Sequence, residues 1–157
     1  MMNLYKNIPK TFSSLRHRNF RLFWMAQLVS LTGTWIQGVA QSWLVLEITN
    51  SAFLLGMINA ISALPILLFS LPGGLVADLV NKRNLLLLTQ ALSKILAFIL
   101  GIMVSLNIAV FWNIALIVFI LGIVNAFYMP CRQSFVVEMV GKQELDYAIA
   151  LNSLIFN

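Results

Sequence analysis

Residues 95–131 read ILAFILGIMVSLNIAVFWNIALIVFILGIVNAFYMPC, and this stretch decides the fold of the chain. It lies between Lys94 and Arg132 and contains no Asp, Glu, Lys, Arg or His. Two more stretches without these residues, 22–46 and 48–77, precede it. A helix needs about 20 apolar residues to cross a bilayer, so each stretch is long enough for a membrane span.

The composition of the whole chain agrees with a membrane location. Of the 157 residues, 61% are hydrophobic and only 10% are Asp, Glu, Lys or Arg. The mean hydropathy is +0.92. A soluble domain with so little charge would expose large apolar patches and precipitate. The composition therefore excludes a soluble enzyme, a disordered tail and a nucleic-acid-binding module.

We predict an all-α integral membrane protein, because continuous apolar runs suit helices that satisfy their own backbone and do not fit alternating barrel strands. The predicted spans are 20–46, 52–77, 84–106 and 110–130, and an incomplete fifth span is expected at 145–157. A chain ending at Asn157 would leave a carboxylate inside the hydrocarbon layer, which is costly. We therefore expect this sequence to be the N-terminal piece of a longer protein.

Basic residues set the expected orientation. Nine of the ten Lys and Arg residues fall on one side of the spans: in the N-terminal segment 1–19, at Arg21 directly after it, between the second and third spans, and after the fourth. The tenth, Lys94, lies within the third span. By the positive-inside rule the basic side is the cytoplasm, so we expect a multi-pass protein of the inner (plasma) membrane with a cytoplasmic N-terminus. Because the topology accounts for the basic N-terminal segment, we expect no nucleic acid as a partner.

Polar residues lie on one side of the first span. At 100° per residue they fall within an arc of roughly 80°, and they are Gln27, Ser30, Thr34, Gln37 and Gln41. Such a stripe avoids lipid and faces either a neighbouring helix or a water-filled path. Helix packing is the simpler interpretation, and a cavity wall that contacts a substrate is the functional one.

A similar stripe follows the third span within an arc of about 120°, and its members are Gln90, Ser93, Lys94, Ala97, Gly101 and Ser105. Lys94 lies near mid-membrane, where burial of a lysine costs roughly 2.5–3.5 kcal/mol on insertion scales. It is either an anion contact or one half of an ion pair, or it snorkels to the inner interface on its long stem. From the two stripes, the candidate cavity-lining residues are Gln27, Thr34, Gln37, Gln41, Gln90 and Lys94.

Two other spans carry small residues four positions apart. They are Gly56 with Ala60 in the second span and Gly122 with Ala126 in the fourth. This spacing predicts close helix packing. Pro65, inside the second span, removes one backbone hydrogen bond and can kink the helix.

The sequence contains no constellation for catalysis. It has a single Cys and a single His, no Gly-rich phosphate loop followed by Lys and Ser or Thr, and no inward pair of carboxylates. We therefore expect no enzyme activity, no cofactor and no metal site.

The connection between the second and third spans reads GLVADLVNKR over residues 74–83. It has a Gly, an Asp four residues later and basic residues after a turn, and it resembles the signature loop of the major facilitator superfamily, which joins the same two helices. Leu79 stands where the family usually has a basic residue, and Asn81 where the superfamily commonly has Gly. Further stretches resemble the branch of the enterobactin exporter and the transmembrane secretion effectors, at 15–24, 33–37, 46–51, 130–134 and 148–153.

The resemblance covers residues from about 13 to 157, and it implies a transporter of twelve helices in two six-helix halves with alternating access. This chain would be the N-terminal part. The resemblance also implies a gate at the signature loop, which begins at Gly74 and in which Asp78, Lys82 and Arg83 form a cytoplasmic latch. We predict Arg132 as the partner of Asp78, since such a pair can break when the halves move. The simpler interpretation is a loop that only turns the chain and fixes the topology.

The function hypothesis is a secondary active exporter of small amphipathic molecules such as drugs or siderophores, with the proton coupling that the resemblance implies. Its partners would be the lipid bilayer, the substrate and the missing C-terminal half. One alternative is a small non-transporting accessory protein of the membrane, or the product of a truncated gene. A small self-assembling multidrug carrier is disfavoured, because such carriers place a carboxylate in the first span and this chain has none before Glu47.

Overall fold

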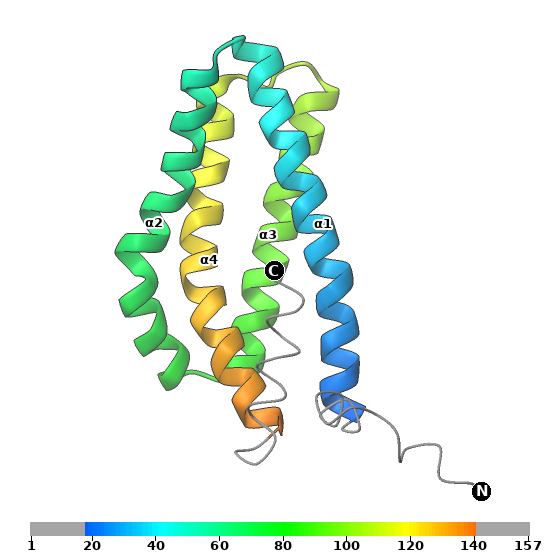
Figure 1. Cartoon of the computed structure of the whole chain (residues 1–157), viewed down its shortest axis with the longest axis vertical. Coiled ribbons are helices and arrows are strands. Elements are labelled where there is room, and N and C mark those ends of the chain that lie inside the picture. The colour runs from blue at the N-terminus through cyan, green and yellow to red at the C-terminus, as the bar shows by residue number, and fades with distance from the viewer. Residues whose placement is uncertain (1–17, 141–157) are drawn as a thin grey trace, which may run out of the picture. The chain divides into compact units, whose positions relative to one another are not determined.

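The structure is a computed structural model that describes residues 18–140. Four α-helices follow one another in it, α1 (Arg18–Thr49), α2 (Ala52–Leu79), α3 (Lys82–Ser105) and α4 (Phe111–Val140) (Figure 1). No strand occurs in this part of the chain, and the predicted all-α class is confirmed. The expected fifth span at 145–157 and nearly all of the N-terminal segment lie outside the described residues.

Three of the described helices are long and apolar enough to cross a membrane. They are α2, α3 and the part of α4 from Phe111 to Glu138. Helix α1, with 32 residues, is also long enough. Its polar stripe makes it less apolar than the other three, and its membrane crossing stays a prediction.

The described helices fall into two compact units. One unit is Ile36–Ser134, which holds the C-terminal part of α1, all of α2 and α3, and most of α4. The other unit includes the N-terminal part of α1 and the end of α4. The apolar core and the close helix contacts belong to Ile36–Ser134.

Asparagine and serine shape the short connections at one end of this unit. Asn50 follows α1 with a φ of 47°, and Asn107 follows α3 with a φ of 56°. Asn adopts this left-handed conformation more readily than most residues with a side chain, so the chain can turn directly after each helix. Ser51 then caps α2, because its hydroxyl oxygen accepts the N–H of Leu54 at 3.4 Å.

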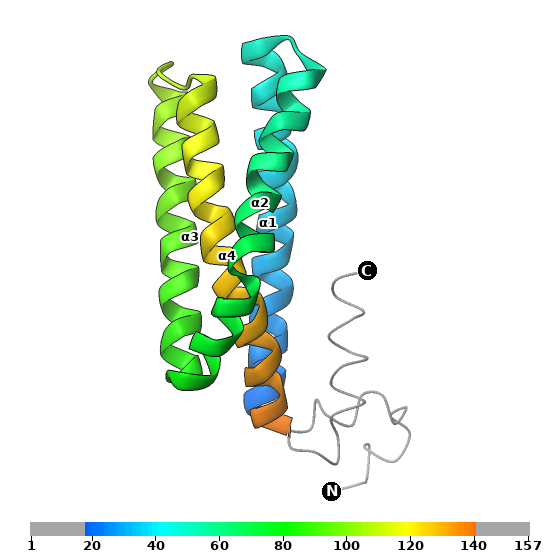
Figure 2. The ribbon, with the colours of Figure 1, turned by 90° about the vertical axis from the view of Figure 1, so that its left-hand side faces the viewer.

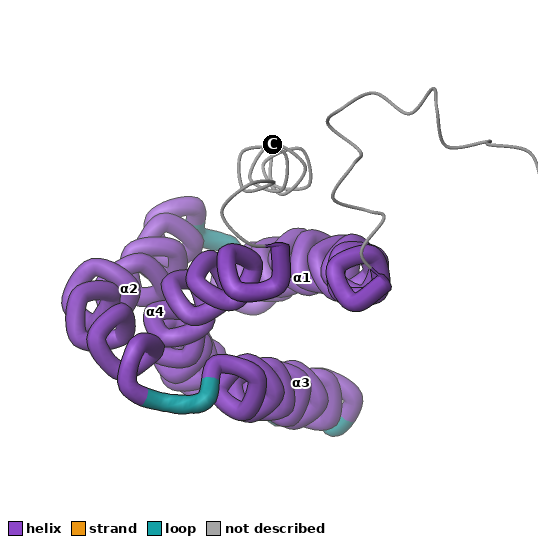
Figure 3. Tube along the Cα trace, turned by 90° about the horizontal axis from the view of Figure 1, so that it is seen from below, coloured by secondary structure: helices purple, strands orange, loops and turns teal. Residues whose placement is uncertain are grey.

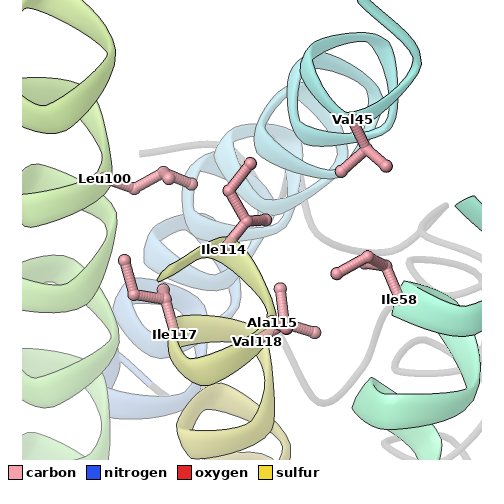
Figure 4. Packing of buried hydrophobic residues seen from close by; sticks show 7 residues of the cluster. All are labelled: Val45, Ile58, Leu100, Ile114, Ala115, Ile117 and Val118. Carbon is pink, nitrogen blue, oxygen red and sulfur yellow. The ribbon is translucent and has the colours of Figure 1, made fainter. Parts of the chain in front are cut away.

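An apolar core joins the helices of this unit. Figure 4 shows its buried side chains, which point toward one another from all four helices: Val45, Ile58, Leu100, Ile114, Ala115, Ile117 and Val118. Four of the seven belong to α4, so α4 is the central helix of the core. Because lipid is as apolar as these side chains, the contact is held by van der Waals packing rather than by exclusion of water.

Two glycines bring α2 and α4 into direct backbone contact. A Cβ at Gly122 would lie 2.6 Å from the carbonyl oxygen of Ser62 and 3.1 Å from Cγ of Pro65. A Cβ at Gly73 would lie 2.5 Å from the carbonyl oxygen of Ala126. No side chain fits at either position. Figure 3, which looks along the helices, shows α2 and α4 lying next to each other. We call this interface the α2–α4 seam.

Helix α4 continues through a proline that lies next to the seam. The span was expected to end at residue 130, but α4 includes Pro130 and runs on to Val140. Pro130 has no N–H to offer the carbonyl of Ala126 four residues earlier. That carbonyl oxygen is the one that a Cβ at Gly73 would approach to 2.5 Å, so it packs against the backbone of α2.

The small-residue prediction is confirmed for α4, and for α2 it stays a prediction, since no described residue packs against its pair. Gly122 and Ala126 both pack against α2, and Ala126 is only 1% exposed. Gly56 has no described atom within 4 Å of an added Cβ, and Ala60 is exposed. On α2 it is instead Pro65 and Gly73 that face α4, since both are buried.

Candidate functional site

The connection between α2 and α3 is a capped turn of two residues, Val80 and Asn81. The N–H of Val80 donates to the carbonyl of Val76 at 3.1 Å and so completes the last turn of α2. The side-chain oxygen of Asn81 accepts the N–H of Asn84 at 3.2 Å and caps α3. The φ of Asn81 is −65°, an ordinary value for a residue with a side chain. Glycine, common at this position in the superfamily, is therefore not required here.

The predicted latch residues gather around this turn. Gly74 lies inside α2, half-buried, and an added Cβ there would have open space. Asp78 lies on the last turn of α2 and is exposed, as is Arg83 on the first turn of α3, whereas Lys82 is half-buried. Within residues 18–140 the structure records no hydrogen bond or ion pair for the carboxylate of Asp78. The turn is thus complete in its backbone and leaves an acidic side chain open at its surface.

Cys131 joins α4 to the beginning of α3. Its Sγ donates a hydrogen bond to the carbonyl oxygen of Lys82 at 3.3 Å, and its side chain is fully buried. Figure 2 shows α3 and α4 side by side. The contact brings the part of α4 that carries Arg132 to the start of α3. Arg132 is only 5% exposed while Asp78 is exposed, and their pairing stays a prediction.

Sequence reasoning missed the roles of two residues at this turn: Asn81, which lies in it, and Cys131, which contacts it from α4. Asn81 appeared there only as a departure from glycine, although Asn directly before a helical stretch is a capping signal. Cys131 appeared there only as the single Cys of the chain and within the stretch 130–134. Its contact with the Lys82 backbone has no local signal, because the two residues are distant in the sequence and meet only through packing.

The polar stripe of α1 contains two kinds of side chain. Thr34 bonds within its own helix, because its hydroxyl donates to the carbonyl of Ser30 at 3.0 Å. Gln27 is 4% exposed, and Gln37 and Gln41 are half-buried. For Gln37 and Gln41 the structure records no hydrogen bond to any residue in the described range.

The polar stripe of α3 shows the same division. The hydroxyls of Ser93 and Ser105 donate to the carbonyls of Thr89 and Gly101, at 3.0 Å and 2.9 Å. Gln90 is half-buried and Lys94 is exposed. Neither has a recorded hydrogen bond or ion pair with another described residue. Hydroxyl groups are thus satisfied within the helix, and the amide and ammonium groups remain available to a partner.

The described residues do not suggest a metal site, since no group of three or more His, Cys, Asp or Glu among them could hold an ion. What the arrangement offers is hydrogen bonding on apolar helices and one charged turn. These features lie on helices of span length and are typical of a multi-pass membrane protein.

Comparison with known proteins identifies the family. Residues 9–157 match the transmembrane secretion effector family, and the chain belongs to this family of the major facilitator superfamily. A relative described as a staphyloferrin A transporter, from Staphylococcus aureus (strain NCTC 8325 / PS 47), is 29% identical over 138 residues. The matched region is 87% of this chain and 35% of that relative, so the chain spans about a third of the relative's length. No solved structure shows a significant match.

Proposed function

We propose that this chain is the N-terminal part of a secondary active transporter that exports small amphipathic molecules, such as drugs or siderophores, and is driven by a proton gradient. The observation that carries the proposal is the family match over residues 9–157. The relative described as a staphyloferrin A transporter supports transport over another membrane function. The distribution of Lys and Arg supports a cytoplasmic N-terminus in the inner (plasma) membrane.

The amide groups of the two stripes support a substrate path. An amide on a membrane helix is costly unless it finds a partner, and a glutamine reaches further than a hydroxyl can. Gln37, Gln41 and Gln90 have no recorded partner within residues 18–140. In the proposed transporter a path is lined by Gln27, Thr34, Gln37, Gln41, Gln90 and Lys94. Water, substrate or another helix binds the amide groups of Gln37, Gln41 and Gln90 there.

The charged turn supports a gate. Its backbone is satisfied by Val80 and Asn81, so the carboxylate of Asp78 is not needed to hold the turn together. In the proposed mechanism Asp78, with Lys82 and Arg83 beside it, pairs with a cation such as Arg132 in one state and separates from it in the other. Arg132 is only 5% exposed in this structure, so the pairing requires a state in which its guanidinium group reaches the surface. An ion pair at the surface contributes about 0–1 kcal/mol and can break again during transport.

Dye transport by the full-length protein tests this function. The protein is produced in bacterial inner-membrane vesicles of inverted orientation, in which an exporter accumulates its substrate inside. We expect uptake of rhodamine 123 once respiration acidifies the lumen, and loss of that uptake after addition of a protonophore. Vesicles without the protein are the control.

Three results would contradict parts of the proposal. Uptake that survives the protonophore excludes the proton gradient as the driving force. Accumulation only in right-side-out vesicles excludes export. No transport of rhodamine 123, rhodamine 110 or ethidium in either orientation counts against an exporter of amphipathic molecules.

A further inference from the structure

Lys94 lies in the middle of a membrane-spanning helix. Helix α3 runs from Lys82 to Ser105, so Lys94 is 12 residues from its first residue and 11 residues from its last. At 1.5 Å per residue each end is about 16–18 Å away, whereas a lysine stem covers roughly one helical turn of 5.4 Å. Snorkelling therefore does not bring this ammonium group to the end of α3.

The charge of Lys94 is not neutralised by the part of the chain that the structure describes. The acidic residues in this part are Glu47, Asp78 and Glu138, and each lies near the end of its helix rather than at mid-membrane depth. Lys94 itself is exposed, and no ion pair with a described residue is recorded for it. A lysine at the centre of a membrane helix costs roughly 2.5–3.5 kcal/mol, so an anionic partner is strongly favoured.

The neighbouring residues leave room for such a partner and add a second donor. Gln90 lies one turn before Lys94 on the same stripe and is half-buried. Ala97 and Gly101 follow on the other side, and a Cβ at Gly101 would have no described atom within 4 Å. The serine hydroxyls of the stripe donate to their own helix. An ammonium group, which only donates, and an amide NH₂ beside it can together bind the two oxygens of a carboxylate.

We propose that Lys94 and Gln90 form a binding site for a carboxylate group within the membrane, and that the carboxylate belongs to the transported molecule. This inference rests on the proposed transport function and predicts that, within its substrate class, molecules with a carboxylate group are preferred. An Asp or Glu side chain from a later helix of the full-length protein is the other source of the same chemistry.

Equilibrium binding with a matched pair of dyes tests the inference. Rhodamine 110 carries a carboxyl group and rhodamine 123 is its methyl ester, so the two dyes differ only at that group. Binding of each dye to the purified full-length protein in detergent is measured by fluorescence anisotropy. We expect wild type to bind rhodamine 110 at least tenfold more tightly than rhodamine 123, and Lys94→Met to lower this ratio of affinities to about one.

Matched variants keep the result interpretable. Lys94→Arg retains the charge and should retain most of the preference, and Gln90→Leu should reduce it about threefold to tenfold. Ser105→Ala lies on the same stripe, but its hydroxyl is already satisfied within α3, so it should bind both dyes as wild type does. If Lys94→Met does not elute as a single species from a sizing column, Lys94→Arg and Gln90→Leu carry the test.

The outcomes separate this inference from the proposed function. Equal affinity of wild type for the two dyes, or a preference that survives both Lys94→Met and Gln90→Leu, overturns the inference even where vesicle transport is observed. If Lys94→Met loses binding of both dyes, and binding returns when one acidic residue of a later helix is also neutralised, then the carboxylate belongs to the protein. That result overturns the substrate assignment. A carboxylate preference without any transport in vesicles overturns the proposed function and leaves the site.

Discussion

The α2–α4 seam and the polar stripe of α3 use glycine in opposite ways. At the seam Gly73 and Gly122 are buried, and an added Cβ at either position would run into backbone of the neighbouring helix. On the stripe Gly101 is exposed, and an added Cβ there would meet no described atom within 4 Å. One region is closed by backbone packing, and the other is open beside a lysine.

The difference shows which groups of this chain make their contacts within the described residues and which groups are left to interact with something else. The seam and the apolar core satisfy their contacts within Ile36–Ser134, mainly through α4. The amide groups of Gln37, Gln41 and Gln90 and the ammonium group of Lys94 have no recorded partner among the described residues. Stability should therefore respond to the seam, and transport should respond to the stripes and the charged turn.

The largest effect on stability is expected at the seam. Gly73→Ala and Gly122→Ala each place a methyl group against a carbonyl oxygen that cannot move aside, at 2.5 Å and 2.6 Å. Overpacking of this kind costs about 1–3 kcal/mol. Thermal unfolding of the full-length protein in detergent should show a lower midpoint for both variants.

Gly56→Ala is the matched control on α2, because the same methyl group meets open space there. It should unfold at or slightly above the temperature of wild type, since Ala favours a helix over Gly by up to about 1 kcal/mol. Equal destabilisation by all three substitutions would show that the seam is not specially close.

The next effect concerns the charged turn. Asp78→Asn removes the charge of the proposed latch without changing the shape of the side chain, and Asn81 continues to cap α3. We expect dye export in inverted vesicles to be abolished while the amount of protein and its unfolding temperature stay at the wild-type level. Glu47→Gln, at the other end of the bundle, is the matched control. Export by Asp78→Asn at the wild-type rate would remove the latch from the mechanism.

A smaller effect on export is expected in the α1 stripe, and it should differ between the glutamine and the threonine side chains. Gln37→Leu removes an amide that has no recorded partner among the described residues, and we expect export to fall several-fold. Thr34→Val removes a hydroxyl that is satisfied by the carbonyl of Ser30, so export should change by less than about twofold. Initial rates of dye uptake at matched protein levels compare the two variants. The reverse order of effects would mean that the stripe serves helix packing.

The smallest predicted effect is at the cap of α3. Asn81→Ala removes the acceptor for the N–H of Asn84 and should lower stability by about 1 kcal/mol. Asn81→Asp retains an acceptor and should lower it less, and Asn81→Gly should cost only a few tenths of a kcal/mol. Chemical denaturation of the full-length protein measures the three variants together. A strict advantage of glycine over Asn would contradict the capping geometry.

The helices could be predicted from the sequence where length and charge decide them. Charge-free apolar stretches placed the second and third spans at 52–77 and 84–106, and the helices run from Ala52 to Leu79 and from Lys82 to Ser105. The end of α4 could not be predicted, because Pro130 normally stops a helix. Here the acceptor that Pro130 leaves open is covered by Gly73, which lies on another helix.

The residue types of the candidate site could be predicted from the sequence, but most of the contacts that these residues make could not. The motif from Gly74 to Arg83 and the stripe periodicities depend on local spacing, which the sequence displays directly. The burial of Arg132 and the bond from Cys131 to the Lys82 backbone depend on how α4 packs against α3. Such contacts join residues far apart in the chain and leave no periodic signal.

The capped turn at Asn81 has a consequence for how the signature loop should be written as a search pattern. Because Asn81 has a negative φ and holds α3 through its side chain, the geometry of this turn calls for a capping residue and does not require the absence of a side chain. Ser, Thr, Asp, Asn and Gly all meet that demand. A pattern that insists on one letter there would overlook diverged members of the superfamily, and a pattern written in terms of the cap would include them.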